Sequence, residues 1–465
     1  MSEKAPLPED LSREELWEMI LELRAALETA KAKNAELEAK LAKPKKTSRN
    51  SSVPPSQTIK GKRDNRRKRR GGKPGHEGKS RENAEPDRVV ECRAEICTSC
   101  GQDVRGQEQE LVSSHQVIDI PPVKALVTEL RRYQTQCECG ACVLGEYPPG
   151  YDEPQQTFGP GVHSLLSYLN GTHHISHQRL QQVMETVFDL KISAGAIANS
   201  LQRTAQRLAQ PAFDILRDIR RSAVIGSDET GMRVEGTNWW LWTVQTPQAS
   251  YFAVADTRSG DVLEALMFDA VAEVWCSDLW SAQLTAQTRR FAICHAHQLR
   301  ALQFAIDAGD TIFAPAFQLL LREALQLTRA RGKLPPDVYE HSVEAVQLSA
   351  QHLLDMETNH EEGRALQRRY HRHWDKLWVF LEREDVPFDN NASERALRPA
   401  VIHRKVIGGF RTEEGAEAYA LYRTIEDTAR KRDQLVLDAL HNVLGFPIFA
   451  SQGATVSHQV YFSSQ

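Results

Sequence analysis

The sequence contains no apolar run approaching the roughly 20 residues that a helix needs to cross a bilayer, so we expect no membrane-spanning segment. Its first residues are acidic and amphipathic, a pattern that does not predict a signal peptide. Cysteine is scarce outside one region, because six of the eight cysteines lie between Cys92 and Cys142. In a chain without an export signal, such a cluster favours a metal site over disulfides.

The chain has 465 residues, enough for several domains, and with 41% hydrophobic residues most of it can bury a core. Its net charge of -4 conceals an asymmetry. Residues 43–79 hold 14 Lys or Arg against two acids, a local charge of +12, so the remainder carries −16. A basic arm on an acidic body predicts a polyanionic partner, usually nucleic acid.

A heptad pattern covers residues 1–43 and predicts a coiled-coil helix over 11–43. Asn34 occupies an a position, which weakens the seam but favours a parallel, in-register dimer. We therefore predict a homo-oligomer, at least a dimer, through residues 16–41; the alternative is an amphipathic helix that packs on its own domain. The seam alternates steps of four and three residues through Leu16, Ile20, Leu23, Leu27, Ala30, Asn34, Leu37 and Leu41.

Residues 44–86 are polar and basic, and they are rich in Gly, Pro and Ser. Such a segment cannot bury enough apolar area to fold alone, so we predict a disordered linker. Its charge density predicts contact with DNA phosphates without sequence readout, and the alternative is a solvated linker. The predicted DNA-binding residues are Arg66, Arg67, Lys68, Arg69, Arg70 and Lys73.

Residues 87–150 carry two cysteine knuckles, "CTSCG" and "CECGAC". The segments "HQVIDI" and "ALVTELRRYQ" between them have strand-like sequence, so the region predicts a zinc-ribbon-like module with a structural Zn²⁺. The pairing in the second knuckle stays open, Cys137 with Cys139 or Cys139 with Cys142, and free reduced thiols are the alternative. The predicted ligands are four of the five thiols of Cys97, Cys100, Cys137, Cys139 and Cys142.

Residues 155–215 have helical patterns, with a break near Gly171 and with Ser193 as the N-cap of the last helix. A short turn before that helix fits a helix-turn-helix DNA-binding domain, and a plain helical bundle explains the pattern about as well.

From residue 220 the pattern changes to three strands, a helix, a strand and a strand–helix unit, the order of an RNase H-like α/β domain. Asp228 follows "AVIGS" and Asp278 follows "EVWCS", so each is expected beside the end of a buried strand; the alternative is a turn acid. We predict a catalytic core that begins at 220–309, a helical insertion at 310–386, a Glu-bearing helix at 387–412 and a helical segment at 413–465.

The stretch "DNNASERALRP" has two interpretations. Asp389 or Asn390 caps a helix and Glu394 pairs with Arg398. Alternatively, Glu394 joins Asp228 and Asp278 as a third carboxylate, because two Mg²⁺ ions need several hard oxygen ligands. For "CHAHQLR" we prefer a strand-end cysteine and a histidine near the active site over a second zinc site.

The blocks "SDETG", "SDLWSA", "CHAHQLR" and "DNNASERALRP" resemble the DDE transposases of bacterial insertion sequences, in particular the insertion sequence 66 family. The resemblance covers nearly the whole chain. It implies that Asp228, Asp278 and Glu394 are catalytic ligands of Mg²⁺ (or Mn²⁺), with Asn391 and Arg395 near the phosphate. "CHAHQLR" departs from the family, which tends to carry an aromatic and a run of basic residues there.

The resemblance further implies a DNA transposase that binds terminal inverted repeats, cleaves DNA and joins the 3′-OH ends to target DNA, in the bacterial cytoplasm at the nucleoid. Two other functions stay open. One is a non-catalytic, zinc-containing, dimeric DNA-binding protein, which predicts that the three carboxylates can change freely. The other is a nuclease of the same fold that cuts without joining.

Overall fold

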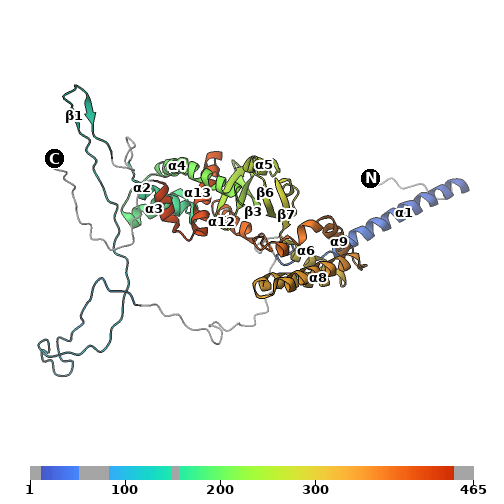
Figure 1. Ribbon diagram of the computed structural model, residues 1–465, viewed down its shortest axis with the longest axis horizontal. Helices are drawn as coiled ribbons and strands as arrows, with labels where there is room; N and C mark the ends of the chain where they lie inside the picture. Colours follow the sequence, from blue (N-terminus) through green and yellow to red (C-terminus); the bar gives the residue numbers. More distant parts are fainter. Residues whose placement is uncertain (1–11, 52–82, 148–156, 445–465) are drawn as a thin grey trace. The chain divides into compact units, whose positions relative to one another are not determined.

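The computed structural model describes residues 12–51, 83–147 and 157–444 (Figure 1). The basic residues from Arg66 to Lys73 lie outside the described residues. The chain divides into two units. One holds Met1–Ile59, Glu129–Gln182 and Ile192–Gln465, and the other holds Lys60–Thr128 and Val183–Lys191. None of the described helices is long and apolar enough to span a membrane.

The centre of the first unit is a five-stranded sheet in the order β5–β4–β3–β6–β7. Strands β3 (Val224–Val234), β4 (Thr237–Gln245) and β5 (Ser250–Ala255) are antiparallel. Strands β6 (Ala272–Ser277) and β7 (Thr288–Ile293) run parallel to β3. With α5 (Asp261–Met267) before β6 and α6 (His295–Ala308) after β7, the predicted order of elements and the α/β class are confirmed.

Local sequence explains the tight turn between β3 and β4. Glu235 and Gly236 form its two central residues, and both have positive φ, 51° and 77°. Two successive positive φ values are the requirement of the type I′ hairpin turn, whose twist matches that of the flanking strands. The long antiparallel pairing that follows fixes the register of the strand that carries Asp228.

One cluster of apolar side chains joins β3, β4 and β5 to α12 (Asn391–Ile407) and α13 (Glu413–Lys431). Its strand members include Met232, Val234, Leu241 and Phe252. Helix α13 also packs along α4 (Ala194–Arg220), and α14 (Val436–Val443) follows it. The described part of the C-terminal segment, residues 413–444, is therefore part of the folded body around the sheet, and Figure 1 shows α4 and α13 beside each other.

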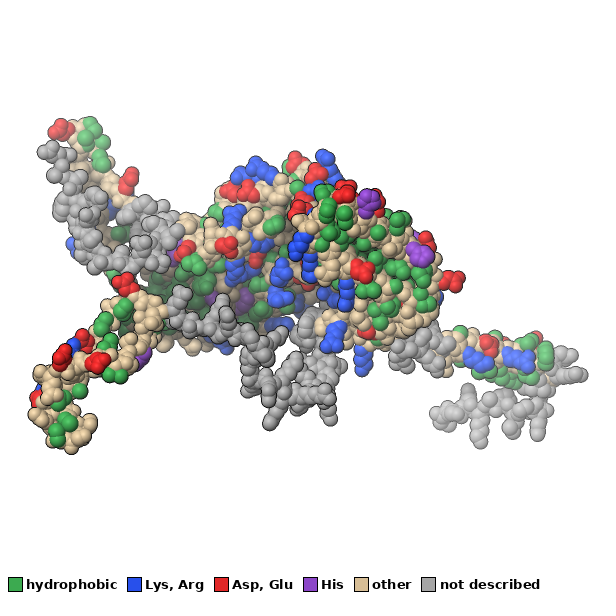
Figure 2. Space-filling view, turned by 60° about the horizontal axis from the view of Figure 1, so that its bottom comes forward, with side chains coloured by type: hydrophobic (Ala, Val, Ile, Leu, Met, Phe, Trp, Pro, Cys, Tyr) green, Lys and Arg blue, Asp and Glu red, His purple; other side chains and the backbone are tan. Residues whose placement is uncertain are grey.

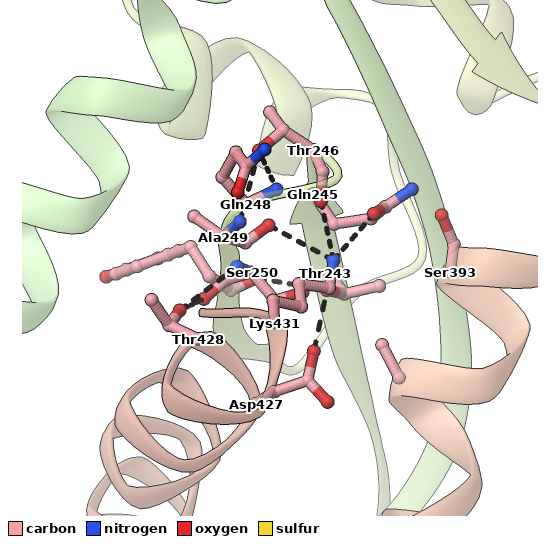
Figure 3. A network of polar contacts seen from close by, with 12 residues as sticks. Thr243, Gln245, Thr246, Gln248, Ala249, Ser250, Ser393, Asp427, Thr428 and Lys431 are labelled. Carbon is pink, nitrogen blue, oxygen red and sulfur yellow. Dashed lines mark hydrogen bonds and ion pairs between the residues drawn. The ribbon is translucent and has the colours of Figure 1, made fainter. Parts of the chain in front are cut away.

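A polar network fastens α13 to the β4–β5 hairpin (Figure 3). The Lys431 ammonium donates to Gln245 Oε1 and to the carbonyl of Thr246, each at 2.7 Å. Thr428 accepts from the backbone N–H of Ser250 at 3.1 Å and donates to its carbonyl at 3.1 Å. Burial lowers the pKa of Lys431 to about 8, although Asp427 nearby favours the charged form. These contacts hold Gln245 on the side of α12, where Figure 3 shows it near Ser393.

The predicted helical insertion is found between α6 and α12. It comprises α7 (Phe313–Ala330), a 3₁₀ turn at Arg331–Lys333, α8 (Pro336–Asp355), α9 (Glu361–Arg372), α10 (Trp374–Leu377) and α11 (Val379–Glu382). Its core is aromatic, with Phe317 stacked on Tyr370 at 4.8 Å between ring centroids. The same cluster includes Val274 of β6 and Ala292 of β7, so the insertion packs on that end of the sheet.

The helices before the sheet are α2 (Pro160–Ser167), a π-helical segment (Tyr168–Thr172), α3 (His177–Phe188) and α4. The predicted break near Gly171 lies in the π-helical segment, and Ser193 caps α4 as predicted, because its Oγ accepts from the N–H of Ala196 at 3.1 Å. A buried stripe of α4 faces α13 and β5. A helix-turn-helix function for this region stays a prediction.

The predicted N-terminal helix is confirmed as α1 (Arg13–Ala42). Its seam side chains in the described part are exposed, Leu23 at 62% and Leu27 at 54%. The segment after it differs from the predicted disordered linker in its first residues. Asn50 is buried, accepts from the N–H of Thr47 at 2.7 Å and donates to Asp307 at 2.8 Å. The turn at residues 47–50 is thus held by hydrogen bonds of the Asn50 side chain and not by apolar packing.

The strand prediction between the cysteine knuckles is wrong. Residues 115–133 form no regular strand. In the described part of the cysteine region, strand pairing consists of β1 (Gln134–Gln136) with β2 (Cys142–Leu144) and one isolated bridge between Ile96 and Asp103. Exposed apolar side chains such as Val117 and Leu126 lack a second layer to bury them, and a hairpin alone is marginal.

Each knuckle nevertheless forms a tight turn. Gly101 N–H donates to the carbonyl of Cys97 at 2.9 Å, and Gly140 N–H to that of Cys137 at 2.8 Å, both glycines having positive φ. The N–H groups of Cys100 and Ser99 lower the pKa of Cys97, and that of Cys139 lowers the pKa of Cys137. The two knuckles belong to different units, so their joint zinc site stays a prediction.

Candidate active site

The register of the sheet brings the first two carboxylates to equivalent positions. Parallel pairing of β3 with β6 ends at Gly226 and Cys276, and Asp228 and Asp278 each stand two residues further on. Side chains two residues along a strand share one face, so both carboxylates leave the sheet on the same side. Asp228 corrects the prediction in one respect, because it lies inside the long strand β3 and not at its end.

The third carboxylate, Glu394, stands in the first turn of α12. Asn390, which precedes that turn, places the helix against the sheet with three hydrogen bonds. Its side-chain amide donates to the carbonyl of Ser227 at 2.7 Å, its Oδ1 accepts from Ser393 at 2.7 Å, and its backbone N–H donates to Cys294 Sγ at 3.2 Å. The residue is 4% exposed, so these bonds form without competing water.

Gly226 allows α12 to come this close to β3. A Cβ at that position would lie 2.4 Å from Gln245 Nε2, 2.9 Å from Asn390 Oδ1 and 3.0 Å from Ser393 Oγ. Such distances are too short for a carbon atom, so a larger residue at position 226 would force these side chains to shift. Two of them, Asn390 and Ser393, belong to the start of α12, so the missing side chain at Gly226 favours the close approach of that helix to β3.

Electrostatics show that the carboxylates share one environment. Burial raises the pKa of Asp228 well above its ordinary value, and the neighbouring Glu229, Asp278 and Glu394 raise it further. Two like charges 4 Å apart at an effective dielectric constant of 20 repel by about 4 kcal/mol. Repulsion of this kind on a buried carboxylate such as Asp228 is relieved by a proton or by a bound cation.

Helix α6 supplies the positive side of the site. Arg300 Nη2 lies 3.4 Å from Glu394 Oε1, and His297 Nδ1 lies 3.6 Å from the same oxygen. Burial lowers the pKa of His297, and Arg300 lowers it further, whereas Glu394 and Asp278 act in the opposite direction. Arg300 was missed in the sequence, where the signal was its spacing of three residues from His297 on one helical face.

Cys294, His297 and Glu394 form a group whose ligand atoms all lie within 4.8 Å of one another. Cys294 directly follows β7 and is buried, which raises the pKa of its thiol to about 12. Cys294 follows the end of a strand and His297 lies near Glu394, as the preferred interpretation of "CHAHQLR" predicts, but the same three residues could hold a metal ion, so the alternative of a second metal site stays open.

The capping interpretation of "DNNASERALRP" is correct in part. Asp389 Oδ1 accepts from the backbone N–H of Asn391 at 3.0 Å, whereas the ion pairs of Glu394 are with α6 and not with Arg398. Asn391 donates its side-chain amide to Asp389 at 2.6 Å. Arg395 is exposed, and its charge contributes to lowering the pKa of Lys431. Their predicted contact with phosphate stays a prediction.

The three predicted carboxylates have the donor chemistry for a hard divalent cation, although among the described residues the group whose ligand atoms lie within 4.8 Å of one another is Cys294, His297 and Glu394. Asp228, Asp278 and Glu394 offer carboxylate oxygens, the ligands that Mg²⁺ and Mn²⁺ prefer. Repulsion from neighbouring carboxylates is one cause of the raised pKa of Asp228, and a bound cation would offset that repulsion. Glu229, the next acid along β3, is not part of this set, because it is 2% exposed and its Oε1 pairs with Arg258 at 2.6 Å.

Comparison with known proteins gives three similarities. The family profile described as "Transposase IS66 family" matches residues 155–418, more than half of the chain. One described as "Family of unknown function (DUF6444)" matches residues 3–82. A curated relative, "Uncharacterized protein y4jO" of Sinorhizobium fredii (strain NBRC 101917 / NGR234), is 34% identical over 79 residues, 17% of this chain. The matched part spans 25% of that relative's length.

Proposed function

Because the chain belongs to the transposase family of insertion sequence 66, we propose that it is a DNA transposase whose active site is Asp228, Asp278 and Glu394. The observation that supports this proposal is electrostatic and positional: Asp278 and Glu394 both contribute to raising the pKa of Asp228, and Asp228 and Asp278 stand two residues beyond paired positions of β3 and β6. The order of strands, three antiparallel and two parallel, supports an RNase H-like arrangement of the core.

The proposed reaction has two in-line displacements at phosphorus. In the first, water attacks a phosphodiester at the element end, the P–O3′ bond breaks, and a free 3′-OH and a 5′-phosphate result. In the second, that 3′-OH attacks a target phosphodiester, forms a new P–O3′ bond and releases a target 3′-OH. The number of phosphodiester bonds is conserved in the second step, so joining needs no energy cofactor.

The chain's own residues have separate roles in this scheme. The three carboxylates would hold two Mg²⁺ or Mn²⁺ ions, which when bound stabilise charge on the attacking and leaving oxygens. Asn390 and Gly226 fix the distance between α12 and β3. Arg300 orients Glu394 from α6 and restrains its rotation. Asn391 and Arg395 are proposed to contact the phosphate beside the site.

The remaining parts are proposed to bind DNA and to assemble the complex. The basic residues from Arg66 to Lys73 would neutralise phosphates, and Figure 2 shows further Lys and Arg side chains gathered over the middle of the folded body. The exposed seam of α1 supports a dimer of this helix. A Zn²⁺ on the knuckles and residence at the bacterial nucleoid complete the proposal.

The test uses Asp228→Asn, Asp278→Asn and Glu394→Gln in the full-length protein with end-labelled element DNA and Mg²⁺. Each substitution keeps the side-chain size and removes the charge that a metal ligand needs. Each variant should lose cleavage and joining by about 1,000-fold or more while DNA binding stays unchanged, and the losses should not add. Arg398→Gln on the exposed side of the same helix is the matched control.

The outcomes separate the three functions. Full joining by Glu394→Gln would contradict the assignment of the site. Loss of DNA binding in all three variants would make the carboxylates structural and favour the non-catalytic DNA-binding protein. Cleavage without joining by the wild-type protein would identify a nuclease of the same fold.

A further inference from the structure

A stack of three side chains lies on the face of β3 opposite to Asp228, and it is anchored on Glu229, the residue that follows Asp228. The guanidinium carbon of Arg258 is 4.8 Å from the ring centre of Trp240 and 4.1 Å from that of Trp280. Arg258 therefore lies between two indole rings, an arrangement in which the cation attracts both π faces. Trp240 is half-buried in β4, whereas Trp280 is 41% exposed.

The stack is anchored from inside the protein. Glu229, 2% exposed, accepts from Arg258 Nε at 2.7 Å and Nη2 at 2.6 Å. Its other oxygen accepts from Gln283 at 2.5 Å, and Gln283 is fully buried. A buried carboxylate with both oxygens bonded holds the guanidinium in one orientation. The exposed indole of Trp280 is consequently a preformed surface supported from behind.

The stack is also connected to the candidate active site. The backbone N–H of Trp280 donates to Asp278 Oδ1 at 2.9 Å, and Glu229 directly follows Asp228 in β3. Trp280 therefore stands two residues beyond Asp278, on the segment that leaves β6 at that carboxylate.

We propose that Trp280, backed by Arg258 and Trp240, is a stacking platform for an unpaired nucleobase of the DNA substrate next to the reacting phosphate. The inference rests on the proposed function, because that function places DNA at Asp278. An exposed indole whose hidden side is already occupied by a guanidinium offers its free face to a flat, π-rich partner. Every base has such a face, so the platform binds without regard to sequence.

This role explains features that packing alone does not. A tryptophan that served only the core would be buried as Trp242 and Trp275 are, both at 0% exposure. Burial of Glu229 and its ion pair with a partly exposed arginine costs desolvation, and a well-packed apolar pair could replace it. The buried ion pair of Glu229 with Arg258 is explained if its role is to hold the Trp280 ring in a fixed position.

The first test is photocrosslinking of the full-length protein with a single-stranded oligothymidylate in which alternate thymines are 5-bromouracil. Irradiation joins a bromouracil to an aromatic side chain that stacks on it, and peptide mass spectrometry locates the join. The proposal expects Trp280 among the joined residues. Joins that map only to other residues, such as the exposed Trp17 of α1, would overturn it.

The second test measures the affinity of the same oligonucleotide for Trp280→Leu and Trp280→Phe, with Trp17→Leu as the matched exposed-tryptophan control. Loss of base stacking predicts about 5- to 100-fold weaker binding for Trp280→Leu, whereas Trp280→Phe and Trp17→Leu stay within about 2-fold of wild type. Equal losses for Leu and Phe would contradict stacking by the ring.

A parallel joining assay on the wild-type protein separates the two proposals. Joining activity together with unchanged affinity in Trp280→Leu would refute the platform and leave the transposase function intact. A crosslink at Trp280 in a protein that neither cleaves nor joins DNA would keep the platform and refute the proposed function.

Discussion

The side-chain amide of Asn390 donates a hydrogen bond to the carbonyl of Ser227 at 2.7 Å and so ties the start of α12 to the residue before Asp228. These residues are 163 positions apart in the chain. The bond fixes the first turn of the helix that carries Glu394 relative to the strand that carries the first carboxylate. The geometry of the candidate site therefore depends on Asn390, a residue outside the predicted set of metal ligands.

Replacement of Asn390 by Asp should impair the site while its shape is kept. The new oxygen cannot donate to Ser227, and two acceptors would face each other in a buried place, which costs about 1–3 kcal/mol of stability. We expect about 10- to 100-fold slower joining with DNA affinity unchanged. Thermal unfolding and a joining assay measure the two effects, and Asn199→Asp on the exposed side of α4 is the control. Wild-type joining by Asn390→Asp would show that this bond does not set the position of Glu394.

Gly226→Ala should separate α12 from β3. The added methyl group would lie 2.4 Å from Gln245 Nε2 and 2.9 Å from Asn390 Oδ1, so the helix turn must move. We expect a loss of about 1–3 kcal/mol of stability and of most joining activity. The matched control is Gly195→Ala in the first turn of α4, where nothing lies within 4 Å of the new carbon and helix propensity favours alanine. Equal behaviour of the two variants would contradict the close approach.

The sequence predicts the strands, helices and carboxylates of the core for a physical reason. Alternating and apolar runs around Asp228 and Asp278 carry the period of buried strands, and Ser193 carries the chemistry of a helix cap. These signals are local, so they survive without knowledge of the tertiary structure. The same local evidence places Glu394 at the start of a helix.

What the sequence does not predict depends on contacts between distant segments. The pairing of Glu394 with Arg300 joins positions 94 residues apart. The spacing of Arg300 from His297 places both on one face of a helix, but it does not indicate which distant residue that face contacts. The role of Asn390 was equally hidden, because an asparagine before a helix reads as a cap. The strand prediction at residues 115–133 was wrong for a different reason. The residues there have high β propensity, but no second layer packs on them, and β propensity depends on such packing.

The knuckles should bind about one Zn²⁺ per chain, which the CxxCG spacing and the lowered pKa of Cys97 favour, because a metal binds the thiolate. Elemental analysis of the purified protein measures this. The double variant Cys97→Ser, Cys100→Ser should lose the metal, whereas Cys92→Ser should keep it. Unchanged zinc in the double variant would contradict the assignment.

His295 should make the fold sensitive to acid. Its ring is 1% exposed and lies 4.7 Å from that of Phe388 and 4.8 Å from that of Phe380. Nε2 lies 2.8 Å from the carbonyl of Leu377, which can only accept, so Nε2 carries the proton of the neutral ring. A second proton on Nδ1 would place a charge among aromatic rings at a helix N-terminus, and burial accordingly lowers the pKa of His295 to about 4.

The sign of the pH effect follows from that shift. Above the ordinary value of 6.5 both the folded and the unfolded chain hold a neutral imidazole, and the full stability is present. As the pH falls from 6.5 towards 4, the unfolded chain binds a proton that the folded chain refuses, so the free energy of unfolding declines by up to about 3 kcal/mol. His295→Gln keeps a donor for Leu377 and removes the titration, so its unfolding free energy should decline less over the same interval. Urea unfolding at several pH values measures both slopes, with the exposed His341→Gln as control, and parallel slopes for wild type and His295→Gln would refute the role of this ring.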